Sequence, residues 1–310
     1  MRAYLVRRFW QSAVTLVGVS ILVFVILRVI PGDPAKMLLP EGAPQAAVEA
    51  LNRHLGLHEP LWIQYGLFLR SVVQGDFGQS FQYRSPALRV VIERVPATIA
   101  LTLTAMALTV LAGVPLGVLA AVRQRTGWDY ASTVLAVLGQ SLPNFWLGIM
   151  LVLLFGVTLR WLPTSGFGGW PSLVLPSVTL AAFPTALVAR LTRSSLLEIL
   201  GQEYIRTGRA KGLGEPRVVL RHALRNAMIP LLTVLGLQIG TLLGGAVITE
   251  SIFAWPGMGK LVVDAIFFRD FPVVQTILIL SATIFVVINL LVDVLYTVLD
   301  PRVRVGRQTA

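Results

Sequence analysis

Six long apolar stretches divide the chain, and polar stretches of very different length separate them. The stretches cover roughly residues 9–30, 96–122, 131–158, 172–191, 230–252 and 273–299. At a rise of about 1.5 Å per residue, a helix of about 20 residues crosses the roughly 30 Å hydrocarbon core of a bilayer. The pattern therefore predicts an all-α integral membrane protein with six transmembrane helices.

The first apolar stretch follows Arg2, Arg7 and Arg8, as the core of a secretory signal peptide would. However, it exceeds the roughly 7–15 apolar residues usual for a signal peptide. It ends in Pro31-Gly32-Asp33-Pro34 without a small-x-small cleavage motif. We therefore expect residues 1-30 to form a cytoplasmic N-terminus and a retained first transmembrane helix.

Residues 31-95 are polar and contain frequent prolines and glycines. Acidic and basic side chains are mixed there, which is unfavourable inside hydrocarbon. We expect a small extramembrane segment, helical in pieces, between the first two transmembrane helices.

Prolines interrupt three of the later apolar stretches. Each removes a backbone hydrogen bond and bends its helix, which membrane bundles tolerate when neighbours satisfy the freed carbonyl. Such bends serve gating in transporters, but proline is also simply more frequent in membrane helices than in soluble ones. The positions are Pro115, Pro143, Pro176 and Pro184.

The distribution of basic residues predicts the orientation. Short cytoplasmic loops are enriched in Lys and Arg. With the N-terminus in the cytoplasm, the basic residues near 2–8, 123–125, 192–229 and 302–307 all lie on that side. We therefore expect both termini to be cytoplasmic, with residues 31-95 periplasmic, a five-helix core over 96-300 and a cytoplasmic tail over 301-310.

Composition agrees with a membrane protein and excludes several functions. The 310 residues are 55% hydrophobic and 13% charged, so a soluble domain is excluded. The net charge of +11 is spread over an apolar chain rather than over a polar domain, which argues against nucleic acid. The chain contains no cysteine, so disulfides, thiolate metal sites and cysteine nucleophiles are excluded. No set of nucleophile, base and acid recurs, and we expect no enzymatic activity.

The predicted cytoplasmic loop over residues 192-229 combines basic residues with regularly spaced apolar ones. Leu196 to Ala210 shows the i, i+3/i+4 spacing of an amphipathic helix, and Lys211 to Pro216 then breaks it. A second helix is expected from Arg217. Such a loop is typical either of a segment on anionic lipid headgroups or of a short helix that docks into another protein.

Several motifs give the chain a resemblance to a known family. Residues 204–213, YIRTGRAKGL, and 221–230, RHALRNAMIP, resemble the cytoplasmic coupling loop of ABC importer permeases of the dipeptide, oligopeptide, glutathione and nickel type. Arg206-Thr207-Gly208 replaces the broader importer motif Glu-Ala-Ala, as in that group, and Gly212 is kept. These importers pair two permeases. The first span and the long segment after it resemble those of the first, or B-type, permease rather than those of its companion. Further matching motifs lie at 31–34, 75–78, 161–163, 253–259, 269–275 and 293–296.

The resemblance implies a type I ABC importer permease fold and an alternating-access mechanism. The chain itself would bind no cofactor, because ATP and Mg would be bound by two partner ATPase subunits. A second homologous permease, a periplasmic or lipid-anchored solute-binding protein and membrane lipids would be the other partners, in a bacterial inner membrane. The resemblance carries coupling to the ATPase over to Glu203, Tyr204, Arg206, Thr207, Ala210, Lys211 and Gly212. Small peptides, glutathione-like thiol peptides, nickel chelates and sugars all remain open as substrates, because relatives for each share these motifs.

Polar residues within the later spans are candidates for the translocation path or gate. Polar groups in membrane helices face the bundle interior or a water-filled path, and hydrogen bonding between helices is the alternative role. The candidates are Gln140, Asn144, Gln238, Glu250 and Asp293. Four glycines in the fifth span favour close helix packing, and they are Gly236, Gly240, Gly244 and Gly245.

Two further patterns do not define sites. The segment Gly257-Met258-Gly259-Lys260 lacks the first glycine and the final Ser or Thr of a phosphate-binding loop. His54 and His58 are four residues apart, but Gly56 and Pro60 disrupt the helix that would align them, so no metal site is expected.

A self-sufficient secondary transporter is the competing functional class. Such proteins usually contain repeated halves and ionisable groups near the bilayer midplane. We find neither a clear internal repeat nor many mid-span charges. A membrane scaffold is the third possibility, but it would not require the hinged basic loop.

Overall fold

The computed structural model describes residues 2–29, 44–46, 49–50 and 58–299. The described part is helical, and its β-structure is one isolated antiparallel bridge between Gln79 and Pro86. The chain divides into two compact units: unit 1 holds residues 1–96 and 261–287, and unit 2 holds residues 97–260 and 288–310. The all-α fold class predicted from the sequence is confirmed.

Four of the described helical segments are long and apolar enough to span a membrane, and the number is six if each of two bent helix pairs is one span. The six predicted spans match this upper number. The four straight candidates lie in α1 (Arg2–Val29), in residues 87–122, in α9 (Trp170–Leu200) and in α14 (Phe271–Leu299). Residues 87–122 comprise α5 (Ala87–Ile92) and α6 (Val95–Val122).

The third predicted span is not one helix. It consists of α7 (Gly127–Ser141), followed by α8 (Asn144–Leu151) and the π-helical turn η1 (Val152–Thr158), and the chain direction bends by 105° between the two arms. Leu142 is extended, with φ −80° and ψ 127°. A proline disfavours the helical conformation at the residue before it, and at Pro143 the helix ends and restarts after the proline.

The predicted loop at residues 192-229 also differs from the structure. The expected helix from Leu196 to Ala210 is wrong, because α9 continues to Leu200 and a break at Gly201 and Gln202 separates it from α10 (Glu203–Ala210). The expected second helix begins at α11 (Glu215–Arg217). It continues through the π-helical turn η2 (Val218–Ala223) into α12 (Leu224–Ile252), so the fifth helix starts well before residue 230.

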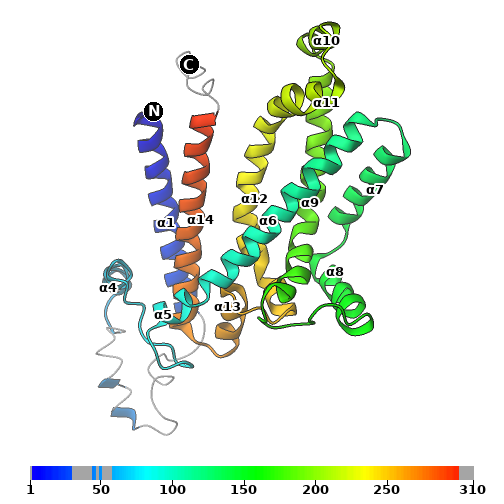
Figure 1. Ribbon diagram of the computed structural model, residues 1–310. Coiled ribbons are helices and arrows are strands. Elements are labelled where there is room, and N and C mark those ends of the chain that lie inside the picture. Colours follow the sequence, from blue (N-terminus) through cyan, green and yellow to red (C-terminus); the bar gives the residue numbers. More distant parts are fainter. Residues whose placement is uncertain (1, 30–43, 47–48, 51–57, 300–310) are drawn as a thin grey trace. The chain divides into compact units, whose positions relative to one another are not determined.

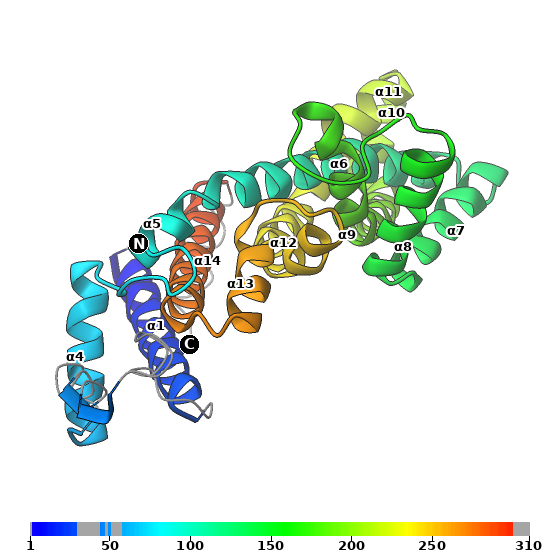
Figure 2. The same cartoon turned by 90° about the horizontal axis from the view of Figure 1, so that it is seen from below.

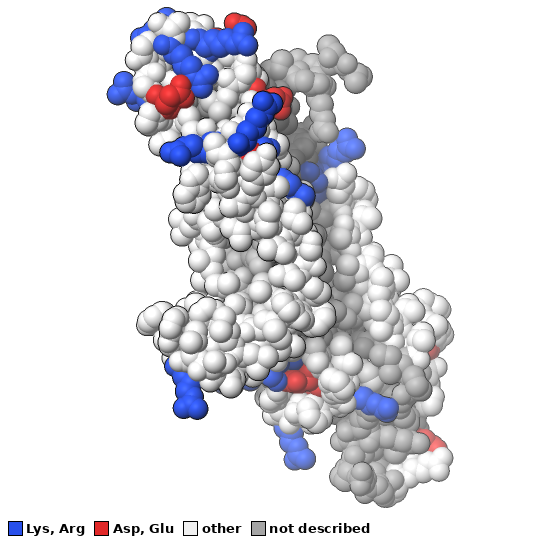
Figure 3. All heavy atoms as spheres, turned by 90° about the vertical axis from the view of Figure 1, so that its right-hand side faces the viewer, with Lys and Arg blue, Asp and Glu red and all other residues white. Residues whose placement is uncertain are grey.

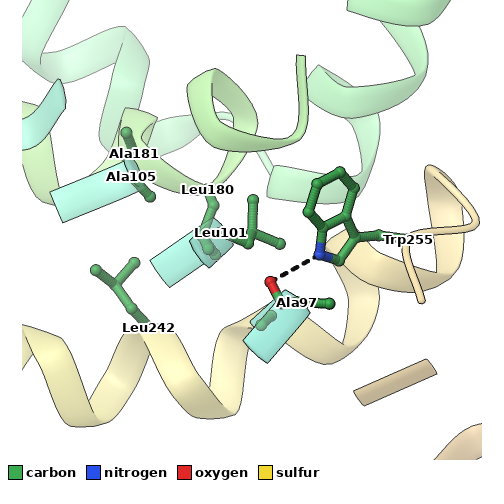
Figure 4. Close-up of a cluster of buried hydrophobic side chains, with 8 residues drawn as sticks. Ala97, Leu101, Ala105, Leu180, Ala181, Leu242 and Trp255 are labelled. Carbon is green, nitrogen blue, oxygen red and sulfur yellow. Dashed lines mark hydrogen bonds between the residues drawn. The ribbon is translucent and has the colours of Figure 1, made fainter. Parts of the chain in front are cut away.

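The core of unit 2 lies between α6, α9 and α12 (Figures 1 and 4). Trp255, 1% exposed, closes one end of it, and its indole Nε1–H donates a 2.9 Å hydrogen bond to the carbonyl of Ala97. The buried members are Ala97, Leu101, Ala105, Leu180, Ala181, Leu242, Ala246 and Trp255. Four of these eight residues are alanines, which suits the close van der Waals packing by which helices in lipid associate.

Glycines bring helices of unit 2 into close approach. A Cβ at Gly117 of α6 would lie 2.4 Å from the carbonyl oxygen of Ala189 in α9. Of the four glycines noted in the fifth span, Gly236 approaches Val292 closely enough that a Cβ would lie 2.3 Å from Cγ1. A Cβ at Gly244 would meet nothing within 4 Å. Of these two glycines, Gly236 is therefore the one that allows close helix packing.

Unit 1 contains α1, α4 (Leu61–Gln74), α5 and the first part of α14. The loop over residues 76–86 contacts the start of α14. The carboxylate oxygen Oδ2 of Asp270, which is fully buried, accepts hydrogen bonds from the Ser80 hydroxyl at 2.5 Å and from the Gln82 N–H at 3.2 Å. These contacts fix a segment that lies some 190 residues earlier in the chain against the N-terminus of α14.

Candidate functional site

The site with the clearest sequence signature is α10, a two-turn helix between two long ones. The chain enters it through Gln202 in an extended conformation, with φ −78° and ψ 152°. Glu203 lies in its first turn and Arg209 in its last, which complements the helix dipole. No side chain caps its N-terminus. A helix this short is marginal in water, so tertiary contacts must hold it.

The C-terminus of α10 is closed by a Schellman motif at Gly212. This residue has φ +79°, a left-handed conformation that suits glycine. The Gly212 N–H donates to the carbonyl of Arg209 at 2.9 Å, and the Leu213 N–H donates to that of Gly208 at 3.3 Å. Nothing lies within 4 Å of a Cβ built on Gly212. The glycine is therefore required by backbone conformation, and its Cα faces open space.

One apolar side chain anchors α10 to the rest of unit 2. Ile205 is 2% exposed and belongs to a buried cluster contributed by α6, α9, η2 and α12. The other members are Ala121, Leu196, Val218, Val219, Ala223 and Ala227. Burying an isoleucine side chain stabilises by about 1.5–3 kcal/mol, which is the main force that holds this helix in place.

Two polar contacts tie α10 to the helix that follows it. The Asn226 amide donates a 2.7 Å hydrogen bond to the Tyr204 hydroxyl. The Arg209 guanidinium forms a two-pronged ion pair with Glu215, at 2.6 and 3.2 Å. Both partners of this ion pair are substantially exposed, so solvent screening limits its contribution to about 1 kcal/mol or less. These contacts orient α10 more than they stabilise it.

A hollow of about 150 Å³ opens beside α10. It is lined by Tyr204, Ile205, Thr207, Gly208, Lys211, Leu213, Val218 and His222. Among the predicted coupling residues, Glu203, Arg206, Thr207, Ala210 and Lys211 are exposed. The structure thus brings the predicted coupling residues together on one protruding, solvent-facing element.

The end of unit 2 that carries α10 and α11 is rich in positive charge, and Figure 3 shows Lys and Arg side chains gathered there. The exposed basic residues between the start of α10 and the first turn of α12 are Arg206, Arg209, Lys211, Arg217, Arg221 and Arg225. Such a surface attracts acidic partners, either a protein or anionic lipid headgroups.

An ion pair fixes the start of α7 to α9. The Asp129 carboxylate, whose side chain is 6% exposed, accepts hydrogen bonds from Nε and Nη2 of Arg193 at 2.7 and 3.0 Å. It also accepts the backbone N–H of Arg125 at 2.9 Å. Because Arg193 lies seven residues before the end of α9, this contact joins α7 to the helix that leads into α10.

The residues predicted to line the translocation path differ in their surroundings. Gln140 and Asn144 lie on either side of the bend at Pro143. The Nε2 of Gln140 is buried and has no hydrogen-bond partner among the described residues. Gln238 is 7% exposed and accepts a hydrogen bond from the Thr241 hydroxyl. The side chain of Asp293 lies outside the described residues. A solute-contacting role for these four stays a prediction.

Glu250 takes part in a buried network that sequence reasoning did not find. The side chain is fully buried. Its Oε1 accepts from the Thr98 hydroxyl at 2.7 Å, and its Oε2 accepts from the Lys260 N–H at 3.0 Å. The Thr98 hydroxyl in turn accepts the N–H of Met258 at 2.8 Å. Together, Glu250 and Thr98 cap the first turn of α13 (Met258–Phe267), whose backbone N–H groups would otherwise be orphaned.

The same network explains the glycines of the segment that superficially resembled a phosphate-binding loop. A Cβ at Gly257 would lie 2.1 Å from Oε1 of Glu250. The backbone can approach the carboxylate only because position 257 has no side chain. In this structure Glu250 therefore has a structural role. The signal that could have revealed it is an acidic residue at the end of an apolar span, seven positions before a glycine.

Comparison with known proteins identifies the family. Residues 113–305 match "Binding-protein-dependent transport system inner membrane component", and residues 1–102 match the N-terminal family "Binding-prot-dependent transport system membrane comp, N-term". The chain belongs to this family of membrane permeases. The B-type assignment made from the sequence is consistent with its relatives.

Two curated relatives match over their full length. The dipeptide transport system permease protein DppB of Alkalihalophilus pseudofirmus is 42% identical over 332 aligned positions, covering 98% of this chain and 100% of the relative. The glutathione transport system permease protein GsiC of Escherichia coli K12 is 43% identical over 304 positions, covering 98% and 99%.

Solved structures show the same fold at lower identity. An inward-facing structure of the MetNI methionine ABC transporter matches with a TM-score of 0.59 at 20% identity, covering 68% of this chain and 96% of that one. An amino acid ABC transporter with histidines matches with a TM-score of 0.51 at 17% identity, covering 69% and 94%. The predicted ABC importer permease fold is thereby confirmed.

Proposed function

We propose that this chain is the B-type permease subunit of an ATP-driven importer and that α10 couples it to an ATPase subunit. The observation that carries the proposal is the construction of α10. This short helix projects exposed charged residues and is fixed to unit 2 by a single deeply buried side chain, Ile205. A partner that pushes on α10 therefore moves the helices around that buried cluster.

The partners follow from the family and complete the proposal. Two ATPase subunits would bind ATP and Mg, a second homologous permease would form the other half of the channel, and a solute-binding protein would deliver the solute. The basic end of unit 2 would face the cytoplasm, as would both termini, in accordance with the positive-inside rule. The ATPase shifts the permease between inward-open and outward-open states only if it binds the two with different affinities.

Substitution of Gly212 tests the coupling role. A β-branched residue is strained at φ +79°, at about 1–2 kcal/mol, so Gly212→Val should loosen the C-terminus of α10. Gly212→Asn is the matched control, because asparagine tolerates this conformation. In proteoliposomes that contain the complete transporter, we expect the valine variant to hydrolyse ATP with reduced uptake and the asparagine variant to retain uptake. Unchanged uptake in the valine variant would contradict the assignment.

A second variant separates coupling from local strain. Ile205→Ala removes the buried anchor without changing the exposed surface of α10. We expect ATPase subunits still to bind this variant, while uptake per ATP hydrolysed falls. If the variant keeps the wild-type uptake per ATP hydrolysed, the Ile205 side chain does not transmit the movement of α10 to the other helices.

We propose a small peptide or a related solute such as glutathione as the substrate, because the two relatives above are permeases for dipeptide and for glutathione. A nickel chelate is the alternative within the same group. Uptake of labelled dipeptide, glutathione and nickel by the reconstituted transporter with its binding protein distinguishes the three. Uptake that needs no ATPase subunit would instead identify a secondary transporter.

A further inference from the structure

Within unit 1, helix α4 contacts α1 through Gln64, Tyr65 and Phe68. The hydroxyls of Tyr65 and Ser20 are 2.8 Å apart, and the Tyr65 ring packs edge-on against Phe24 with centroids 5.2 Å apart. Phe68 also contacts Phe24, at 5.7 Å. At the other end of the contact, Nε of Arg28 donates to the Gln64 side chain at 2.9 Å. The position of α4 along α1 is therefore fixed by four contacts, made by three side chains of each helix.

These contacts place α4 at membrane depth. Residues 7–26 of α1 form the candidate membrane span, and Ser20 lies six residues inside its end. Ser20 and Arg28 are eight residues apart, or about 12 Å along the helix axis, which equals the diameter of one helix with its side chains. Helix α4 thus occupies the layer between the charged end of α1 and the apolar part of its span.

Helix α4 crosses α1 rather than running along it. Figure 1 looks nearly down the axis of α4 while α1 runs up the page, and Figure 2 shows α4 from the side. If α1 crosses the bilayer, α4 lies close to the membrane plane. This is the orientation of interfacial amphipathic helices, which bury their apolar face about 5–10 Å into the boundary between headgroups and acyl chains.

The face of α4 that does not contact α1 carries an apolar stripe. Trp62, Gly66, Leu69 and Val73 follow one another at intervals of four, three and four residues, which aligns them on one side of a helix. Trp62 is 75% exposed and Val73 is 86% exposed. At about 100° per residue, Arg70 and Gln74, also exposed, lie roughly 70° and 110° around the helix from the middle of the stripe, on the side that also carries the exposed Leu67.

The chemistry of the stripe favours lipid over a protein partner or water. It contains no charged or hydrogen-bonding residue except the Trp62 indole, and tryptophan is enriched at membrane interfaces. At the same level of α1, Ile21 and Val25 are apolar and exposed as well.

We propose that α4 is an interfacial membrane helix, embedded in the outer leaflet through Trp62, Gly66, Leu69 and Val73. Arg70 and Gln74 face the headgroups and water. The segment over residues 31-95, expected from its polarity to lie wholly outside the membrane, thus contains a part that dips into the bilayer. Helix α4 stabilises the outer end of α1 from the side, because Tyr65 and Gln64 contact α1 on either side of Phe24.

The absence of cysteine from the chain makes a direct test possible. Single variants Trp62→Cys, Gly66→Cys and Val73→Cys place a nitroxide label on the stripe, and Arg70→Cys and Gln74→Cys are the matched controls on the polar side. A Cβ at Gly66 meets nothing within 4 Å, so Gly66→Cys should fold even if Trp62→Cys does not. The labelled chain is studied in the assembled transporter, with partner cysteines replaced, in nanodiscs of phosphatidylcholine and phosphatidylglycerol.

Electron spin resonance then compares collisions with oxygen, which partitions into lipid, and with a water-soluble nickel complex. We expect oxygen collisions to exceed nickel collisions several-fold at positions 62, 66 and 73, and the reverse at 70 and 74. Strong nickel collisions on the stripe would place α4 in water and overturn the proposal. Low collision rates with both reagents on the stripe would overturn it as well, because they would show that another protein covers the helix.

Discussion

Removing the Thr98 hydroxyl is the sharpest test of the cap on α13. Thr98 is 1% exposed, and its hydroxyl serves two groups at once, donating to the Glu250 carboxylate and accepting the Met258 N–H. Thr98→Val keeps the shape of the side chain and removes both hydrogen bonds. The turn between α12 and α13 then loses its link to α6.

The expected magnitude follows from the groups left without partners. A buried polar group deprived of its hydrogen bond costs about 1–3 kcal/mol, and more when it is charged. Two such groups, one of them a carboxylate oxygen, give a loss of about 2–6 kcal/mol for Thr98→Val. At roughly 2 °C per kcal/mol for a chain of this size, the apparent Tm should fall by about 4–12 °C.

The chain provides a matched control one helical turn away. Thr102 is 3% exposed, and its hydroxyl has no hydrogen-bond partner among the described residues. Thr102→Val should therefore leave the Tm unchanged or raise it, because no hydrogen bond is lost. Thermal unfolding of both variants is measured in the same detergent at one scan rate, since membrane protein unfolding is often irreversible. Equal Tm values for the two variants would refute the proposed cap.

Two further predictions concern the packing of α9. Arg193→Leu leaves the buried Asp129 carboxylate without its ion-pair partner and should destabilise the protein by about 2–4 kcal/mol. Arg193→Lys keeps the charge but not the two-pronged geometry, so its stability should lie between those of the wild type and the leucine variant. A wild-type Tm in the leucine variant would show that the ion pair contributes nothing. Gly117→Ala places a methyl group 2.4 Å from the Ala189 carbonyl and should cost about 1–3 kcal/mol. Gly18→Ala, which meets nothing within 4 Å, is its control, and equal Tm values for the two would contradict the close approach.

The sequence predicted the elements whose cause is local. Long apolar runs specify membrane helices because hydrocarbon provides no alternative hydrogen-bond partner for the backbone. The bend at Pro143 is also predicted from a local cause, because proline has no N–H to continue the helix. Gly212 was singled out by its motif, and the structure gives the physical cause, which is a left-handed helix terminus.

The sequence-based prediction was wrong at the end of α9, where the apolar spacing favours a continuous helix but the chain breaks. The apolar spacing from Leu196 to Ala210 is continuous and predicts one helix, but the chain breaks at Gly201 and Gln202. This break lets Ile205 turn back onto the cluster around Val218 and Ala223. The energy of that burial, which depends on a helix later in the chain, decides where α9 ends.

By itself, the sequence determined that this chain is a helical membrane protein and which family it belongs to, and it singled out the loop that we propose couples to the ATPase. Hydropathy and short motifs are properties of neighbouring residues, so they can be read along the chain. Only the tertiary structure decided that Glu250 and Thr98, 152 positions apart, share a hydrogen bond, and that α4 lies across α1. Such contacts form between residues that are distant in the chain and become neighbours only when the helices pack, so no local pattern records them.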